Sequence, residues 1–262
     1  MTIFTAPLKK GDKIAICSPA GRIDPKKVDG AVRELAHQGW EPVVMPHALG
    51  EYGSYSGTPD ERYADMAAAF KDPEIRAILC SRGGYGVVHI LDRLAELPLA
   101  DDPKWVIGFS DISALHALMA TKGIASIHSP MAAQIMKGTS DPYTASLFGL
   151  LRGERPAYTF PSHEYDRFGI ATGTLLGGNL AVLAELINTP YDILRPDTIL
   201  FLEDVSEPIY KIERIFYQLR LSGLFDKIRG LIVGQFTDYK PDATYADMET
   251  MIRDAIAPYN FP

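Results

Sequence analysis

The sequence has few cysteines, no long apolar run and no concentration of basic residues, and each absence excludes a class of protein. Only two of its 262 residues are cysteine. Both Cys17 and Cys80 stand in apolar runs, so we expect reduced thiols in a core rather than a disulfide framework or a metal site. No segment approaches the roughly 18 apolar residues of a membrane span, and the N-terminus lacks the pattern of a signal peptide. We therefore expect a soluble, cytoplasmic protein without a membrane partner.

Positive charge is also scarce. The chain has 26 Lys and Arg against 33 Asp and Glu, a formal net charge of -7, and its basic residues are scattered. Nucleic-acid affinity comes mainly from clustered Lys and Arg, so no nucleic-acid partner is expected. What is present is a normal globular balance, 47% hydrophobic and 23% charged. The length is sufficient for one large domain or two ordinary ones.

The first half of the chain alternates apolar runs with segments of helical period. Strands are expected at residues 13–19, 41–46, 75–81, 104–109 and 125–131, and helices between them at 25–39, 58–73, 85–97 and 111–123. Strict alternation predicts a parallel sheet covered on both faces. With right-handed crossovers, the fold class is α/β with a doubly wound N-terminal sheet.

The alternation stops after about residue 137. Residues 138–170 are rich in Gly, Pro, Ser and aromatic residues, and this segment is interpreted as a linker with at most one helix. We expect an N-terminal α/β domain over residues 1–137 and a second, mixed domain over residues 171–262. The sequence shows no internal repeat and no low-complexity tract.

The stretch GFSD, residues 108–111, follows an apolar run directly and precedes a helical pattern. A turn from strand into helix can expose a serine in a strained backbone conformation, and the N-H groups of the helix end can stabilise an oxyanion. Serine and aspartate are also preferred residues for beginning a helix, and Ile112 stands where a hydrolase elbow usually has its second glycine. From these residues alone, a nucleophile and a helix cap remain alternatives for Ser110.

Other expected strand ends carry polar or glycine residues as well. The loop SRGGYG (81–86) can approach a ligand closely through its backbone, or it is a simple turn. Glu203 and Asp204 end an apolar strand, where a carboxylate can orient an imidazole or merely cap the strand. Of the six histidines, His47 follows the second expected strand, but only His128, at the carboxyl end of the fifth, is well placed to be a general base for Ser110.

Several segments together resemble the serine LD-carboxypeptidases (muramoyltetrapeptide carboxypeptidases), relatives of the microcin C immunity peptidase. The matching segments follow the family's order and cover essentially the whole chain. They are KGDKIAICSPAG, SRGGYG, GFSD, HSPM, GTLLGGNLAVLAELINTPYD, ILFLEDVSEPIYKIERIFYQLRLSGLF and IRGLIVGQF. The resemblance implies a flavodoxin-like or amidotransferase-like N-terminal domain, a C-terminal domain with a barrel-like sheet, and an active site between them.

The resemblance also implies a Ser-Glu-His triad, in which Ser110 matches the nucleophile and Glu203 the acid. The family's histidine belongs to a Gly-His motif that is expected beyond residue 262, and none of the six histidines matches it. The oxyanion hole of the family maps to the backbone N-H groups of Asp111 and Gly84.

Arg82 and Asn179 lie in matching motifs and are expected to contact the substrate. The implied reaction removes the C-terminal D-alanine from murein tetrapeptides by cleaving an L,D peptide bond, in the recycling of cell-wall peptides. No metal and no cofactor are expected, and the family leads us to expect a homodimer.

Two alternatives remain open at this point. One is an immunity-type peptidase acting on peptidyl-nucleotide conjugates, for which Tyr52, Tyr55 or Phe168 are candidates for an aromatic wall. The other is a non-catalytic small-molecule or peptide-binding protein on the same scaffold.

Overall fold

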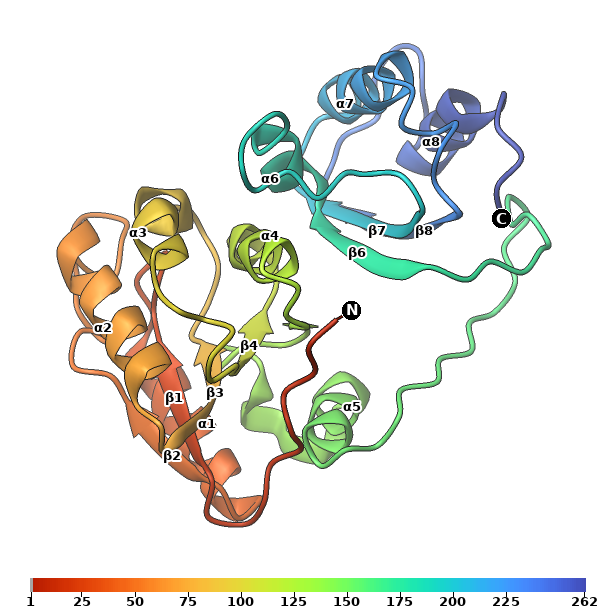
Figure 1. Cartoon of the computed structure of the whole chain (residues 1–262). Helices are drawn as coiled ribbons and strands as arrows, with labels where there is room; N and C mark the ends of the chain where they lie inside the picture. The colour runs from red at the N-terminus through yellow and green to blue at the C-terminus, as the bar shows by residue number, and fades with distance from the viewer. Residues whose placement is uncertain (1) are drawn as a thin grey trace. The chain divides into compact units, whose positions relative to one another are not determined.

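The structure, a computed structural model, describes residues 2–262 and divides into two compact units (Figure 1). The first unit comprises residues 1–158 and the second residues 159–262. Of the helices within residues 2–262, none combines the length and the apolar character needed to cross a bilayer.

Five parallel strands form the sheet of the first unit, in the order β2-β1-β3-β4-β5. They are β1 (Lys13–Cys17), β2 (Glu41–Val44), β3 (Ile75–Cys80), β4 (Trp105–Gly108) and β5 (Ile127–His128). This order is that of a doubly wound sheet with a switch in strand order between β1 and β3, and it confirms the predicted fold class. Cys17 and Cys80 pair in register on these two strands as free, fully buried thiols, as expected.

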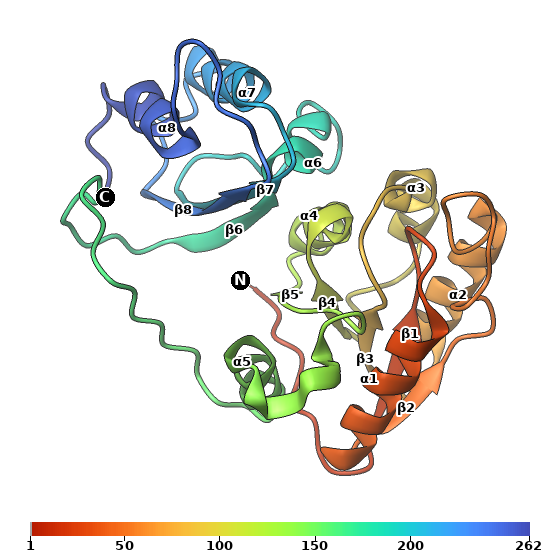
Figure 2. The same cartoon turned by 180° about the vertical axis from the view of Figure 1, so that it is seen from behind.

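Helices cover both faces of this sheet (Figures 1 and 2). One side holds α1 (Pro25–His37), the 3-10 segment η3 (Ile135–Ser140) and α5 (Pro142–Leu151). The other holds α2 (Pro59–Lys71), α3 (Leu91–Ala95) and α4 (Ser113–Thr121). Between α1 and α5, the ring of Trp40 packs edge-on against Phe148 at 5.4 Å, and both side chains belong to one apolar core with the strands. Burial of each such large side chain contributes about 1.5–3 kcal/mol.

Local sequence explains where the helices begin. Asp24 caps α1 by accepting a hydrogen bond from the N-H of Lys26, while Thr58 and Glu61 form a reciprocal capping box at the start of α2. The helix expected over residues 85–97 is instead split into the 3-10 segment η1 (Val87–His89) and α3. Gly86, with φ 126, delays the start to Val87, and Ile90, with φ -120, has a non-helical backbone between the two segments.

The second unit has its own sheet of three parallel strands, in the order β6-β7-β8. The strands are β6 (Thr174–Asn179), β7 (Thr198–Val205) and β8 (Gly230–Thr237), and the helices are α6 (Leu180–Glu185), α7 (Ile209–Leu221) and α8 (Met248–Ile256). At Gly177, φ is 153 and a Cβ would lie 1.8 Å from the carbonyl oxygen of Phe201. Only glycine therefore permits β6 and β7 to approach each other as they do.

Candidate active site

Ser110 occupies the turn that connects β4 to α4. It begins the 3-10 segment η2 (Ser110–Ile112), it is half-buried, and its φ is 63. A non-glycine residue in this left-handed region is strained, and such residues cluster at functional sites. Gly108 gives this turn the room it needs, because a Cβ there would lie 2.9 Å from the side chain of Ile112. The turn thus holds the serine in a costly conformation beyond the end of a parallel strand.

The double-glycine loop, residues 81–86, lies directly against this turn. A Cβ added to Gly83 would lie 2.8 Å from both Cβ and Oγ of Ser110 and 3.4 Å from the backbone nitrogen of Asp111. This contact of Gly83 was not expected from the sequence, which indicated its neighbour Gly84 for the oxyanion hole. Gly84 has φ 116 and approaches the backbone of Gly21. The two adjacent glycines in the sequence could have indicated this contact, since the backbone of the loop can approach Ser110 closely only where its residues are small.

Asp111 links the serine turn to the same loop through its side chain. The residue is 3% exposed, and its Oδ2 accepts a hydrogen bond of 3.0 Å from the N-H of Val87, the residue that follows the double-glycine loop. Its backbone N-H lies on the side of the turn that faces Gly83. Asp111 therefore fixes the position of the loop relative to Ser110.

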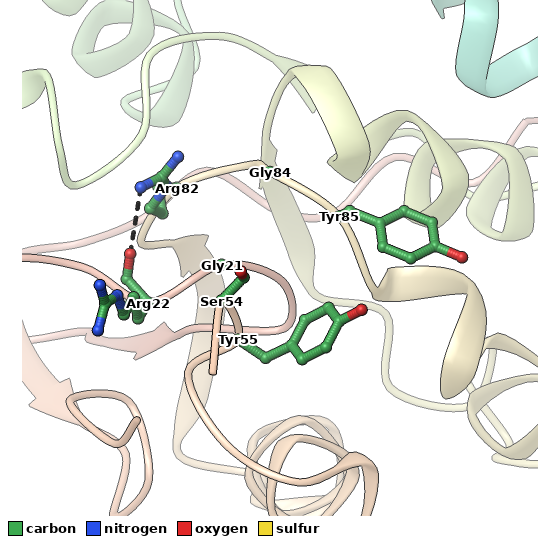
Figure 3. A pocket seen from close by; sticks show the side chains of 7 residues that line it. All are labelled: Gly21, Arg22, Ser54, Tyr55, Arg82, Gly84 and Tyr85. Atoms are coloured by element: carbon green, nitrogen blue, oxygen red, sulfur yellow. Dashed lines mark hydrogen bonds between the residues drawn. The ribbon is translucent and has the colours of Figure 1, made fainter. Parts of the chain in front are cut away.

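A cavity of about 500 Å³ opens beside the double-glycine loop (Figure 3). Its lining residues come from the loops after β1, β2 and β3, and they are Gly21, Arg22, Ser54, Tyr55, Arg82, Gly84 and Tyr85. The switch between β1 and β3 places the cavity where doubly wound folds bind their ligands.

Figure 3 shows the two arginines of this cavity at one end and the two tyrosines at the other. Arg22 forms an ion pair with Glu51, and Arg82 donates a hydrogen bond of 3.2 Å from Nη1 to the carbonyl oxygen of Arg22. The rings of Tyr55 and Tyr85 lie 6.3 Å apart. The cavity thus offers cationic and aromatic groups to a ligand.

His116 and His128 lie near the end of β4. The His116 ring nitrogens lie 2.8 Å from the carbonyl oxygen of Gly108 and 2.8 Å from Oγ of Ser126. Burial lowers the pKa of His116 to about 4, so the ring is neutral at pH 7 and fastens α4 to the end of β4. His128, at the end of β5, has its ring 6.1 Å from those of Phe109 and His116.

In the second unit, two acids stand near the end of β7 and have different environments. Asp204 is 3% exposed and accepts hydrogen bonds from the backbone N-H groups of Ala181 and Val205 and from the amide of Asn179. Burial raises the pKa of Asp204, whereas these hydrogen bonds lower it. Glu203 is 9% exposed, and among the described residues its Oε1 has no hydrogen-bond partner.

Burial, and to a lesser extent the charge of Asp204, raises the pKa of Glu203 to about 7. Gly234 on β8 gives this side chain room, because a Cβ there would lie 3.1 Å from Cβ of Glu203. A buried carboxylate oxygen without a donor is costly, and such groups in native proteins call for an explanation. Glu203 is therefore ready to accept a hydrogen bond from a further group, such as an imidazole N-H.

Asn179 pairs with Glu203 in the register of β6 and β7. Its side-chain oxygen accepts from the N-H of Val182 and so caps α6, and its Nδ2 donates to Asp204 at 2.9 Å. Both polar atoms of the amide thus have partners within the second unit. As to metals, no group of three or more His, Cys, Asp or Glu side chains suited to holding an ion occurs within residues 2–262.

A serine at positive φ between a parallel strand and a helix is typical of nucleophile elbows, so fold and site together define a serine hydrolase of α/β architecture. Comparison with known proteins gives the family. Residues 14–129 match the LD-carboxypeptidase N-terminal domain and residues 172–262 match the LD-carboxypeptidase C-terminal domain, so the chain belongs to the LD-carboxypeptidase family. The resemblance predicted from the sequence is confirmed.

Individual relatives agree with this assignment. The chain is 33% identical to the murein tetrapeptide carboxypeptidase of Pseudomonas aeruginosa, over 86% of this chain and 77% of the relative. A crystal structure of muramoyltetrapeptide carboxypeptidase from Oxalobacter formigenes aligns with a TM-score of 0.82 at 27% identity and covers 95% of this chain and 86% of its own. The microcin C7 self immunity protein MccF, in complex with aspartyl sulfamoyl adenosine, shares the fold with a TM-score of 0.85 at 22% identity, over 99% of this chain and 88% of its own.

Proposed function

We propose that this protein is a serine LD-carboxypeptidase that removes the C-terminal D-alanine from murein tetrapeptides. The observation that carries the proposal is the strained conformation of Ser110, with φ 63, directly against the glycine loop. Ser110 is not the N-cap residue of η2 or of α4, so capping does not explain why a serine holds a backbone conformation that costs about 1–3 kcal/mol. The relative from Pseudomonas aeruginosa, named for murein tetrapeptides, supports the substrate class.

In the proposed mechanism, Oγ of Ser110 attacks the carbonyl carbon of the bond that joins D-alanine to the peptide. The backbone N-H groups of Asp111 and Gly84 hold the oxyanion of the tetrahedral intermediate. A histidine takes the hydroxyl proton and gives it to the leaving amine, and Glu203 orients that imidazole. D-Alanine leaves with this proton, and water then hydrolyses the ester on Ser110.

Two further residues are proposed to bind the substrate. Arg82 stands in the cavity beside the glycine loop, and we assign it to a carboxylate of the peptide. The positive charge of its neighbour Arg22 is partly neutralised by the ion pair with Glu51. The guanidinium of Arg82 is therefore the better partner for a negatively charged group of the substrate. Asn179, whose amide is bonded to Asp204 and α6, is proposed to contact the substrate while it holds the end of β6 beside β7.

The test is D-alanine release from a murein tetrapeptide by this protein. Ser110→Ala should reduce turnover at least about 10³-fold with an unchanged circular dichroism spectrum. Ser140→Ala is the matched control, because the Ser140 hydroxyl only bonds the carbonyl oxygen of Lys137 on the 3-10 segment η3. A tetrapeptide ending in L-alanine should not be cleaved. Turnover retained in the Ser110 variant would exclude this mechanism.

A second candidate substrate is a peptidyl-nucleotide conjugate. The paired rings of Tyr55 and Tyr85 in the cavity favour it, because a nucleobase stacks on aromatic side chains. Competition decides between the two substrates. If an aminoacyl sulfamoyl nucleoside inhibits the protein far more strongly than a tetrapeptide analogue does, the conjugate is the better substrate class.

We also propose that the protein acts in the cytoplasm and as a homodimer, and both proposals rest on the family resemblance. Cell fractionation tests the first. Light scattering coupled to size-exclusion chromatography tests the second, and a monomer at micromolar concentration would contradict it.

A further inference from the structure

Arg62 is a buried cation at the carboxyl edge of the first sheet. It lies in the first turn of α2 and only 1% of it is exposed. Its guanidinium donates to the carbonyl oxygens of Gly57 at 3.1 Å, of Pro19 at 2.7 Å and of Gly86 at 2.7 Å. Its Nη2 also lies 3.1 Å from Nδ1 of His89, and since a guanidinium can only donate, that nitrogen accepts.

The charge of this side chain has an unusual environment. Among residues 2–262, no carboxylate forms an ion pair with Arg62, whose Cζ lies 5.1 Å from the ring centre of Tyr55. The carboxylate of Asp111 attracts the guanidinium, but from beyond ion-pair distance. Burial of a charge without an opposite charge in contact is costly, and it is tolerated only where hydrogen bonds and polarisable groups replace water. An apolar residue at this position would leave these three carbonyl groups without their donor, so the guanidinium serves the loops that it bonds.

The three carbonyl groups belong to three different loops. Pro19 follows β1, Gly57 follows β2, and Gly86 ends the double-glycine loop after β3. These same loops supply the walls of the cavity. Gly86 can approach Arg62 only because it has no side chain, since a Cβ there would lie 2.8 Å from Nη1. One side chain therefore joins all three cavity loops.

The double-glycine loop is also held from the opposite side. The carboxylate of Asp111 accepts from the N-H of Val87, so residues 86 and 87 are bonded to two different elements. Gly83, three residues before Gly86, contacts the side chain of Ser110. A shift of the loop end would therefore move the backbone that faces the hydroxyl.

We propose that Arg62 is a positioning residue for the hydrolytic reaction. By bonding Gly86, Pro19 and Gly57 at once, it holds the double-glycine loop at the distance from Ser110 at which a backbone N-H can stabilise the oxyanion. This inference rests on the proposed function, and it assigns to a residue of α2 a role in transition-state stabilisation that acts through the loop.

The expected signature is a loss in kcat without a matching change in KM. Arg62→Lys keeps the charge but cannot reach three carbonyl groups, so kcat should fall about 10- to 100-fold while KM changes less than about threefold. Affinity for a boronate transition-state analogue should fall in proportion to kcat/KM. Hydrogen exchange at residues 82–87 should rise. Arg62→Met should show a larger loss, and if this variant does not fold, the lysine variant decides.

Arg93→Met is the matched control. Arg93 also pairs with a residue of α2, Asp60, at 2.6 Å and lies over the ring of Tyr63 at 3.8 Å, but it bonds none of the three loops. Its loss should leave kcat, analogue affinity and exchange at residues 82–87 unchanged. A lower melting temperature with wild-type kcat in Arg62→Lys would show a purely structural role and would overturn the proposal.

Failure of the proposed function can be recognised separately. If the wild-type protein releases no D-alanine, the substrate assignment is wrong, and the rate at which a fluorophosphonate labels Ser110 then decides the role of Arg62. Slower labelling in Arg62→Lys than in wild type and Arg93→Met supports the proposal. Equal labelling rates, or no labelling of wild-type Ser110, overturn it.

Discussion

Replacing Glu203 with glutamine is expected to stabilise the second unit at neutral pH while it abolishes catalysis. The carboxyl is 9% exposed, its Oε1 has no partner among the described residues, and burial raises its pKa from 4.5 to about 7. This difference corresponds to about 3 kcal/mol by which folding disfavours the charged form. If Glu203 is the acid of a triad, the protein tolerates this loss of stability because the carboxylate is needed for catalysis.

The pH dependence follows from the direction of this change in pKa. The folded protein holds the Glu203 proton more tightly than the unfolded chain, so the free energy of unfolding falls as pH rises from 4.5 to about 7 and stays lowered above it. Glutamine has no charge to lose. At about pH 8 the variant should gain about 1–3 kcal/mol, because a buried amide without a partner offsets part of the benefit. Below about pH 4 the gain should vanish.

The measurement is a urea titration of residues 1–262 at several pH values, read by hydrogen-exchange mass spectrometry of peptides from β7. Trp40 and Trp105 both lie in the first unit, so their fluorescence is an internal control that should not change. Glu207→Gln is the control variant, since the Glu207 carboxylate already pairs with Lys211 at 2.8 Å. A stability difference that is independent of pH, or a loss of stability at pH 8, would refute the reasoning.

Two further predictions concern the serine turn. Gly83→Ala should lower kcat/KM at least about 100-fold, because its Cβ would lie 2.8 Å from Ser110 Oγ and displace it; an unchanged rate constant would contradict the packing described. Ser110→Gly should raise the free energy of unfolding by about 1 kcal/mol, since glycine adopts φ 63 without strain, whereas Ser110→Ala should not. Urea titration followed by tryptophan fluorescence measures both variants, and equal stability of the two would argue against strain at this turn.

The sheet of the first unit was predictable because its strands are covered on both faces. Such strands are short apolar runs, and polar residues begin where each run ends, as at Ser110 after β4. In the second unit, the apolar run of β7 likewise ends near Glu203. The place where an apolar run ends in the sequence was therefore enough to predict which residues lie at the carboxyl ends of the strands. Helix starts have local signals in the sequence, such as Pro25 at the first position of α1 and the N-cap residue Thr58 of α2.

The contacts between distant loops were not predictable in the same way. In the helical segment that begins at Thr58, a single arginine is typical of a solvated face, yet Arg62 is buried by three carbonyl groups that lie far apart in the sequence. Backbone carbonyls are present at every residue, so the sequence carries no signal for which of them a guanidinium will bond. The choice between Gly83 and Gly84 as the neighbour of the hydroxyl likewise depends on the path of the loop in space.

The two neighbouring acids of β7 have an evolutionary consequence. Asp204 uses its oxygens to hold α6 and the end of its own strand, whereas Glu203 leaves one oxygen unused. Glutamate and glutamine codons differ by one nucleotide, so if Glu203 is the acid of the triad, a single point mutation at position 203 silences the enzyme while its scaffold becomes more stable. A lineage released from selection for the reaction thus has a direct route to a durable, inactive paralogue, and position 204 offers no such route.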